Sequence, residues 1–225
     1  IYESELGAVG HYKYSDLGMI LMKELIERVT KTTFQQYVSE VFYTPMGIDR
    51  LTFLPLDKFK SDEIVPTSIS PDMRKGLVQG MVHDPAAAML GGVSGHAGLF
   101  GNAESLASLM QMLLNGGEYK NVQYLKPETI NAFTAKQSAN SRRGMGWDKP
   151  EMDKNRANPA CDYASEETFG HSGFTGTIVW ADPKYDLIYV FLSNRVYPTQ
   201  ENRKLIEMGV RKNIMNAVYE SFLFP

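Results

Sequence analysis

The sequence predicts an α+β protein in which helices come first, an antiparallel sheet follows, and a helix ends the chain. Two apolar runs of strand-like composition, 177–181 and 187–193, are joined by a Pro- and Asp-containing turn, which is the pattern of a β-hairpin. Apolar residues recur with helical spacing in about residues 14–135 and again over 201–222. Because helices and strands are segregated along the chain, α+β is favoured over a doubly wound sheet.

Composition excludes several classes of protein. The 225 residues (25.3 kDa) suffice for a single domain with a real core. A net charge of −3, with no dominant basic patch, argues against nucleic acid as a partner. No apolar run approaches the ~20 residues of a membrane span. The single cysteine, Cys161, excludes an internal disulfide framework and a cysteine-rich zinc site.

Four helices are predicted before the sheet and one after it. Ser15 and Asp16, both favourable N-cap residues, precede the first apolar stripe with helical spacing. Asn102 opens a later helix, and Gly116 follows its end. The expected helices cover about 17–30, 33 to before Pro45, 103–115, 127–133 and 201–222.

Loops and strands account for the remainder. Residues 48–75 lack a sustained period and are expected to form a long loop with short turns. Residues 76–101 are dense in glycine, which indicates a functional loop or one packed closely against other backbone. Strands are expected over 168–173, 177–181 and 187–193, with a short one at 144–147; the sheet and the last helix then occupy about 144–225.

The first candidate for chemistry is Tyr14-Ser15-Asp16 at the start of a helix. The positive end of a helix stabilises a phenolate, so a tyrosine here could take part in proton transfer. Asp16, two positions on, could face the same cleft. The alternative is that Tyr14 is a core aromatic residue and that Ser15 and Asp16 only cap the helix.

The second candidate lies at the end of one strand and the start of the next, from His171 through Ser172 and Gly173 to Thr177. Gly173 would let a ligand approach the backbone closely. A free N–H at the edge of a strand can stabilise an oxyanion. The alternative is a glycine-containing turn with a structural histidine.

The third candidate combines His83 and Asp84 with His96 in the glycine-dense loop. A histidine beside an aspartate could be a base with its orienting partner, or the start of a metal site. Two histidines and one aspartate are too few and too loosely spaced for zinc, and a structural loop is the alternative. No G-x-S-x-G, P-loop, G-x-G-x-x-G or H-E-x-x-H motif occurs, and no serine is followed three residues later by lysine.

The order of these elements resembles the C-terminal part of the serine β-lactamase and penicillin-binding-protein superfamily, most of all the branch of class C β-lactamases, DD-peptidases and esterases. Tyr14-Ser15-Asp16 resembles the Tyr-x-Asn element of that branch, and 169–176 resembles its Lys/His-Thr/Ser-Gly strand. Further similarity covers 33–48, 98–117 and 182–194. The resemblance implies one β-lactamase/transpeptidase-like domain over 1–225, an antiparallel sheet flanked by helices plus a helical region, incomplete at its N-terminal side.

The resemblance also implies a function. It implies a serine acyl-hydrolase that acts on a peptide, ester or β-lactam carbonyl through an acyl-enzyme, without a metal or organic cofactor. Tyr14 would be the catalytic proton carrier, and the Phe174 N–H an oxyanion donor. Asp16, His171, Ser172 and Gly173 would contact the substrate. Asp16 in place of asparagine and His171 in place of lysine both weaken the case for β-lactam hydrolysis.

The Ser-x-x-Lys element of the superfamily precedes its tyrosine, and the thirteen residues before Tyr14 do not contain it. We therefore expect this chain alone to be inactive. A missing N-terminal segment or a partner chain would supply the nucleophile and cover an exposed strand at 187–193. The expected substrate is a small molecule or a peptidoglycan fragment outside the cytoplasm. The alternative is a noncatalytic ligand-sensing or scaffold module with the same fold.

Overall fold

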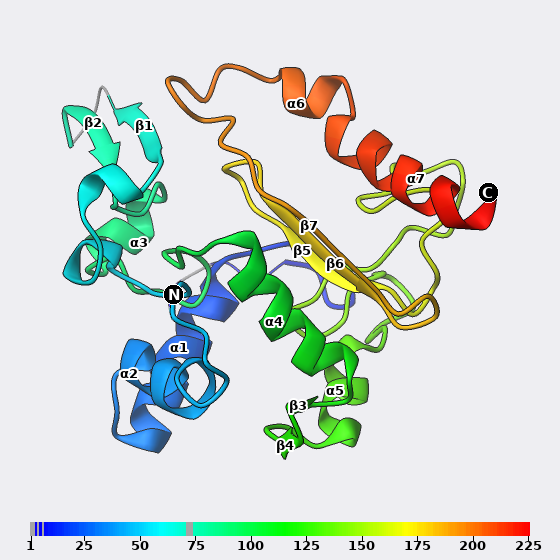
Figure 1. Cartoon of the computed structure of the whole chain (residues 1–225), viewed down its shortest axis with the longest axis horizontal. Coiled ribbons are helices and arrows are strands. Elements are labelled where there is room, and N and C mark those ends of the chain that lie inside the picture. The colour runs from blue at the N-terminus through cyan, green and yellow to red at the C-terminus, as the bar shows by residue number, and fades with distance from the viewer. Residues whose placement is uncertain (1–2, 4, 6, 71–73) are drawn as a thin grey trace.

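An antiparallel sheet of three strands forms the centre of the computed structural model, which describes residues 3, 5, 7–70 and 74–225 (Figure 1). The strands β5 (Phe169–Ser172), β6 (Ile178–Asp182) and β7 (Leu187–Phe191) follow one another in space as they do in sequence. Gly170 pairs with Trp180, and Trp180 pairs with Tyr189. The predicted meander is therefore confirmed.

Each face of this sheet packs against one helix. Successive strand residues point to opposite faces, so Trp180 and Tyr189 face α7 (Val210–Leu223), where they join Met215 in a buried cluster. Phe169 and Ala181 belong to the cluster that includes α4 (Ala103–Leu114) on the opposite face. Figure 1 shows the sheet between these two helices. This layered arrangement of helices and an antiparallel sheet confirms the predicted α+β fold class.

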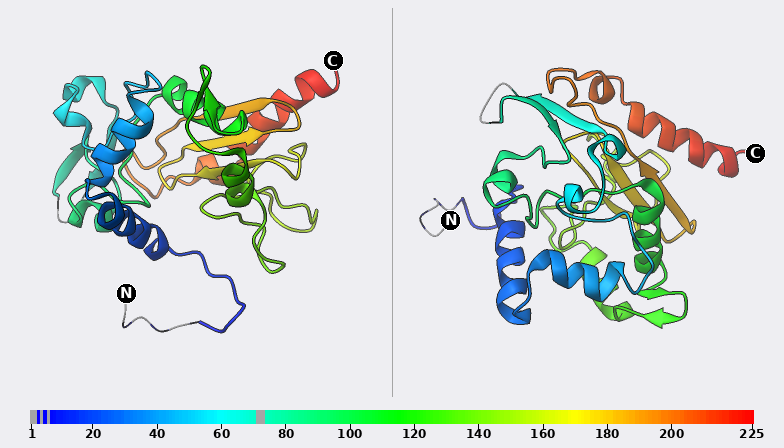
Figure 2. Two further views of the ribbon diagram at one scale, coloured as in Figure 1. Left: turned by 90° about the horizontal axis from the view of Figure 1, so that it is seen from below. Right: turned by 60° about the vertical axis from the view of Figure 1, so that its left-hand side comes forward.

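The helical region contains the elements that the apolar spacing predicts. Figure 2 shows α1 and α2 on the side of the molecule away from α7. The second helix changes from α to π geometry before Pro45, so it continues as η1. The bounds are α1 (Leu17–Thr30), α2 (Phe34–Val38), η1 (Ser39–Tyr43) and α5 (Pro127–Thr134). The short helix α3 (Pro85–Met89) lies within the glycine-dense segment and is not among the predicted helices.

Two predictions for the connecting segments are wrong in part, and one hairpin has no counterpart among the predictions. Residues 48–75 contain the expected short turns, η2 (Pro55–Asp57) and η3 (Ser61–Glu63), but they also contain β1 (Pro66–Ser70), which pairs with β2 (Gly76–Gln79); positions 71–73 of that segment lie outside the described residues. The hairpin without a predicted counterpart joins β3 (Glu118–Tyr119) to β4 (Val122–Gln123). No strand forms at 144–147; instead, the next residue, Asp148, bridges to Gly170. These pieces are too short for periodicity to reveal.

The predicted last helix is divided into α6 (Lys204–Glu207) and α7. Gly209 lies between them with a φ of 60°, in the left-handed region. Such a residue ends one helix before the next begins, although the apolar spacing continues across it.

The glycine-dense loop packs closely against backbone, as one of its two predicted explanations requires. A Cβ on Gly95 would lie 2.1 Å from the Met19 carbonyl oxygen in α1, and a Cβ on Gly98 would lie 2.2 Å from the Gly92 oxygen. Side chains at these positions would therefore push the loop away from its neighbours.

The apolar stripe of α1 does not face a core. None of the residues of α1 is buried by the described part of the chain, and Leu25 and Val29 are 50% and 73% exposed. β7 is likewise an edge strand that pairs with β6 alone among the described residues. No helix in the described ranges is long and apolar enough to cross a membrane.

We predict opposite effects for alanine at two glycines. Gly95→Ala should lower the free energy of unfolding by about 1–3 kcal/mol, because its Cβ overlaps the Met19 carbonyl. Gly18→Ala should raise it by roughly 0.5–1 kcal/mol, because Gly18 is helical and has open space around it. Urea unfolding measures both. Equal effects of the two substitutions would contradict this packing.

We also predict a pH-dependent contribution from the buried Asp182. Burial opposes its charge, but hydrogen bonds from Ser165 (2.6 Å) and Tyr219 (2.6 Å) outweigh this effect and lower the pKa of Asp182. Tyr219→Phe should therefore cost about 1–3 kcal/mol at neutral pH. The cost should shrink below about pH 4, because a lowered carboxyl pKa stabilises the fold only above its folded value.

The matched control is Tyr163→Phe, which removes a 3.1 Å hydrogen bond to the exposed Glu220. It should change the free energy of unfolding by less than about 1 kcal/mol. A Tyr219→Phe effect that is no larger than the control, or that grows in acid, would contradict the assignment.

Candidate active site

Tyr14 and His171, which are far apart in sequence, lie side by side. Their ring centroids are 6.1 Å apart, with the planes tilted by 34°. Tyr14 precedes α1, and His171 is in β5. Tyr14 is 54% exposed, so it is not the core aromatic residue of the structural alternative. The structure therefore brings the first two sequence candidates to one surface.

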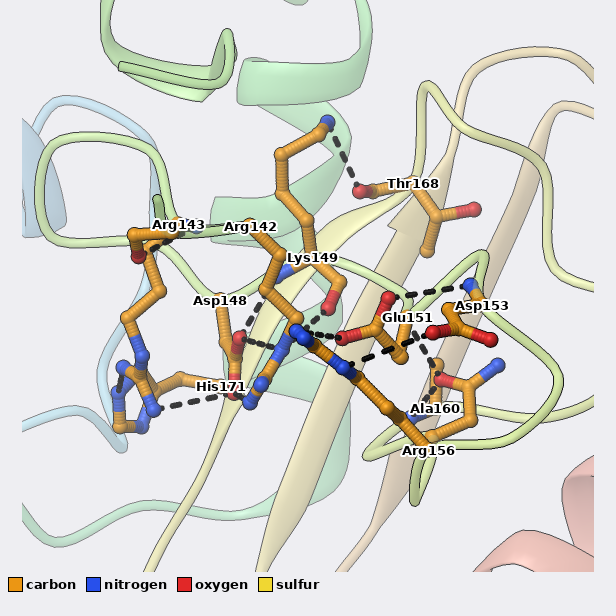
Figure 3. Close-up of polar contacts among 12 residues, drawn as sticks. Arg142, Arg143, Asp148, Lys149, Glu151, Asp153, Arg156, Ala160, Thr168 and His171 are labelled. Atoms are coloured by element: carbon orange, nitrogen blue, oxygen red, sulfur yellow. Dashed lines mark hydrogen bonds and ion pairs between the residues drawn. The ribbon is translucent and has the colours of Figure 1, made fainter. Parts of the chain in front are cut away.

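Arg143 joins these two rings. Its Nη1 lies 3.0 Å from His171 Nε2, and its guanidinium carbon lies 4.7 Å from the centroid of the Tyr14 ring. Its Nη2 donates to Asp148 Oδ2 at 3.1 Å. Figure 3 shows Arg143 reaching between His171 and Asp148.

Asp148 holds the arginines against the sheet. Its carboxylate is buried and also contacts Arg142 Nε at 2.8 Å. Its backbone exchanges hydrogen bonds with Gly170 at 2.8 and 3.1 Å, which ties this segment to β5 just before His171. The backbone bridge and the ion pairs therefore set the position of Arg143 together.

The hydrogen bonds assign the tautomer of His171. A guanidinium only donates, so His171 Nε2 must accept from Arg143. Nδ1, 2.9 Å from the Ser172 carbonyl oxygen, must then carry the proton and donate it. His171 is therefore a neutral imidazole in this arrangement, and the positive charge beside Tyr14 belongs to Arg143.

The electrostatics around Tyr14 differ from the expectation of a stabilised phenolate. Burial raises the pKa of Tyr14, the nearby Asp16 carboxylate raises it further, and Arg143 only partly opposes them. Asp16 occupies the N-cap position of α1, but its side chain makes no capping hydrogen bond. Because its pKa is raised, the Tyr14 phenol stays protonated at neutral pH.

Phe174 presents its N–H at the end of β5. Within the described chain this N–H donates no hydrogen bond, whereas the Phe174 carbonyl accepts one from Arg195 Nε at 2.8 Å. A Cβ on Gly173 would lie 2.4 Å from Thr177 Oγ1, so a side chain there would have to displace the Thr177 hydroxyl. His83 stacks on the Phe174 ring with centroids 5.4 Å apart.

The third candidate separates into two parts. His96 Nε2 lies 2.9 Å from Asp84 Oδ1, and its Nδ1 lies 2.9 Å from Ser94 Oγ. Asp84 also caps α3 by accepting from the Ala87 N–H at 2.7 Å. His83 is not part of this chain of hydrogen bonds, and no group of three or more potential metal ligands occurs among the described residues.

The surroundings of Asp84 and His83 shift the pKa values of both side chains. Burial opposes the charge of Asp84, but the Ala87 N–H and His96 outweigh it and lower the pKa of Asp84. Burial, with Arg74 and Arg195 nearby, lowers the pKa of His83, so His83 is neutral beside Phe174. The Asp84–His96 pair therefore braces the loop that places His83 against Phe174.

Arg143 and Asp148 are not among the site residues that the sequence predicts. The sequence does contain a pattern at this place: two arginines at 142–143, a Gly-Met-Gly segment at 144–146, and then Asp148. Asp148 is the residue that forms the β-bridge to Gly170 and is buried there. Charged residues in irregular segments are normally solvated, so this pattern carries weight only when the neighbouring strand is known.

The fold is that of the β-lactamase and penicillin-binding-protein structures. A penicillin-binding protein homolog from Caulobacter crescentus superposes with a TM-score of 0.57 at 21% identity, over 84% of this chain and 54% of that one. A simvastatin synthase from Aspergillus terreus gives 0.60 at 15% identity, over 90% and 54%. At such identities the likeness establishes the fold.

Sequence relatives establish the family. The family model described as Beta-lactamase matches residues 7–208. A "Putative D-alanyl-D-alanine carboxypeptidase" of Escherichia coli K12 is 36% identical over 212 residues, 87% of this chain and 49% of the relative. An "N-acetylmuramyl-L-alanine amidase" of Bacillus subtilis 168 is 32% identical over 229 residues, 92% and 52%. The chain belongs to the β-lactamase family, within the serine β-lactamase and penicillin-binding-protein superfamily, and spans about half the length of these relatives.

We predict that Arg143 determines the tautomer of His171. In the imidazole ¹⁵N spectrum of the wild-type chain, Nδ1 of His171 should be protonated and Nε2 unprotonated, because Nε2 accepts from Arg143. Arg143→Met should shift the proton toward Nε2, whereas Arg143→Lys should retain part of the wild-type pattern. With four histidines in the chain, His171→Asn identifies the signal. A protonated Nε2 in the wild-type chain would contradict the assignment.

Proposed function

We propose that this chain is part of a serine acyl-hydrolase of the peptidase or esterase type. The observation that carries the proposal is the Tyr14–Arg143–His171 group, with the Tyr14 and His171 rings 6.1 Å apart, together with the Phe174 N–H just beyond β5, which donates to no described residue. A proton carrier, a fixed cation and an oxyanion donor are the parts that acyl transfer requires besides a nucleophile.

The proposed reaction proceeds through an acyl-enzyme. A serine Oγ, activated by a lysine, attacks the substrate carbonyl carbon, and the Phe174 N–H stabilises the oxyanion. Tyr14, which its raised pKa keeps protonated at neutral pH, donates its proton to the leaving amine or alkoxide, and the proton that the lysine took from the serine passes to the Tyr14 oxygen. Water then attacks the acyl carbon and gives its proton, through the same groups, to the serine Oγ, which releases the acid and regenerates the serine. Asp16, Ser172 and Gly173 orient the substrate, and His171 orients Arg143.

The nucleophile is proposed to lie outside this chain. No serine of the sequence has lysine three residues later, and the chain covers 49% of the carboxypeptidase relative. The exposed stripe of α1 and the edge of β7 that pairs with no other described strand are apolar surfaces that a further segment or a partner would cover. In this proposal the isolated chain is inactive.

The proposed substrate is a peptide or amide bond of a peptidoglycan fragment, and the proposed location is outside the cytoplasm. The names of the carboxypeptidase and amidase relatives support this substrate class. The second candidate function is a noncatalytic ligand-sensing module, which the absence of Ser-x-x-Lys from the sequence favours.

Labelling with a fluorescent penicillin and a fluorophosphonate tests the proposal. The 225-residue chain should form no adduct, and the complete gene product should form one. In the complete product, Tyr14→Phe should slow acylation by about 10²–10⁴-fold, because the proton donor is lost. Tyr119→Phe, in the β3–β4 hairpin, should leave the rate unchanged.

Two outcomes would contradict the proposal. A stable adduct on a serine of the isolated chain would show that the nucleophile lies within it. A complete gene product that neither forms an adduct nor cleaves peptidoglycan peptides, yet binds them, would favour the ligand-sensing module.

A further inference from the structure

A cavity of about 540 Å³ opens next to the candidate site. Lys136, Arg142 and Arg156 line it, together with the chain segment 10–12, and Glu151 is the one acidic residue of its lining. Its volume is in the range of sites for small organic ligands, and its lining is more polar than that of most such sites.

The charges around this cavity do not cancel. Arg142 and Arg143 share a single carboxylate, that of Asp148. Arg156 faces Glu151 at 3.9 Å and Asp153 at 3.6 Å, and Lys136 forms no ion pair with any described residue. Four cationic side chains thus meet three carboxylates, an excess of one positive charge in a chain whose net charge is −3.

Two connections link the lining of the cavity to the Tyr14 site. Arg142 in its wall is adjacent in sequence to Arg143, which contacts both Tyr14 and His171. The segment 10–12 ends two residues before Tyr14, and Asn140 Nδ2 donates to the Gly10 carbonyl at 3.0 Å, which attaches that segment to the 139–142 part of the lining. The cavity and the Tyr14 site therefore share two neighbouring stretches of chain.

We propose that this cavity is a subsite for one carboxylate in the non-reacting part of the substrate. A single excess positive charge suits one carboxylate. The groups that would bind it are the Lys136 ammonium, which pairs with no carboxylate of the described residues, and the exposed Arg156 guanidinium, whose contacts with Glu151 and Asp153 are long at 3.9 and 3.6 Å. The link to substrate rests on the proposed function, whereas the binding of a carboxylate does not.

Calorimetric titration of the 225-residue chain tests the subsite with two peptides. Both are L-alanyl-γ-D-glutamyl-L-lysyl-D-alanine amide, and they differ only in whether the glutamyl α-carboxyl group is free or amidated. The free carboxylate should bind about fivefold more tightly at low salt, as expected for a partly exposed ion pair. The preference should fall as salt is added.

Lys136→Gln and Arg156→Gln should each reduce this preference, and the double variant should abolish it. Lys120→Gln, in the β3–β4 turn and outside the cavity, is the matched control and should keep it. Equal affinity of the two peptides, no binding of either, or a preference that survives the double variant would overturn the proposal.

The two proposals fail separately. Penicillin labelling of the complete gene product without any peptide preference would overturn the subsite alone. A clear carboxylate preference without labelling or cleavage would overturn the hydrolase proposal and leave the subsite in place.

Discussion

The carboxylate of Asp148 lies buried between two arginine side chains and the edge of the sheet. An unpaired charge in such a place would be strongly unfavourable, so Arg142 and Arg143 must stay beside it. The bridge from Asp148 to Gly170 fixes the same residue to β5. The position of Arg143, and with it the relation of Tyr14 to His171, depends on this one carboxylate.

The sheet makes that anchoring rigid. β5 is held by β6, and β6 lies between α4 and α7, so His171 projects from a strand whose neighbours are packed on both faces. Sites on packed strands are positioned more sharply than sites on free loops. The glycine-dense loop contributes a second fixed part of the site. Gly95 lets this loop pack directly against the backbone of α1. The Asp84–His96 contact stabilises the same loop, which places His83 against Phe174.

The charges of His171, Arg143 and Asp16 determine the electrostatic environment of Tyr14. The neutral tautomer of His171 leaves Arg143 as the cation next to Tyr14, while partial burial and the Asp16 carboxylate raise the pKa of Tyr14. The site therefore combines a protonated phenol with a fixed positive charge. Arg142, which shares the Asp148 carboxylate with Arg143, lines the neighbouring cavity, so the same carboxylate positions a cation on each side.

Local sequence was enough to determine the main elements and the candidate positions 14 and 171. The helices at 17–30 and 103–114 and the strands of the meander follow from apolar period and caps, which act within a few residues. The hairpin β1–β2, the break at Gly209, the exposed stripe of α1 and the roles of Arg143 and Asp148 were decided by tertiary structure. Each of these features depends on a partner that is distant in sequence or on a single backbone torsion. Neither kind of dependence produces a periodic pattern in the sequence. Whether a charged residue is solvated or buried is a property of its neighbours in space, and for Asp148 only the fold supplies them.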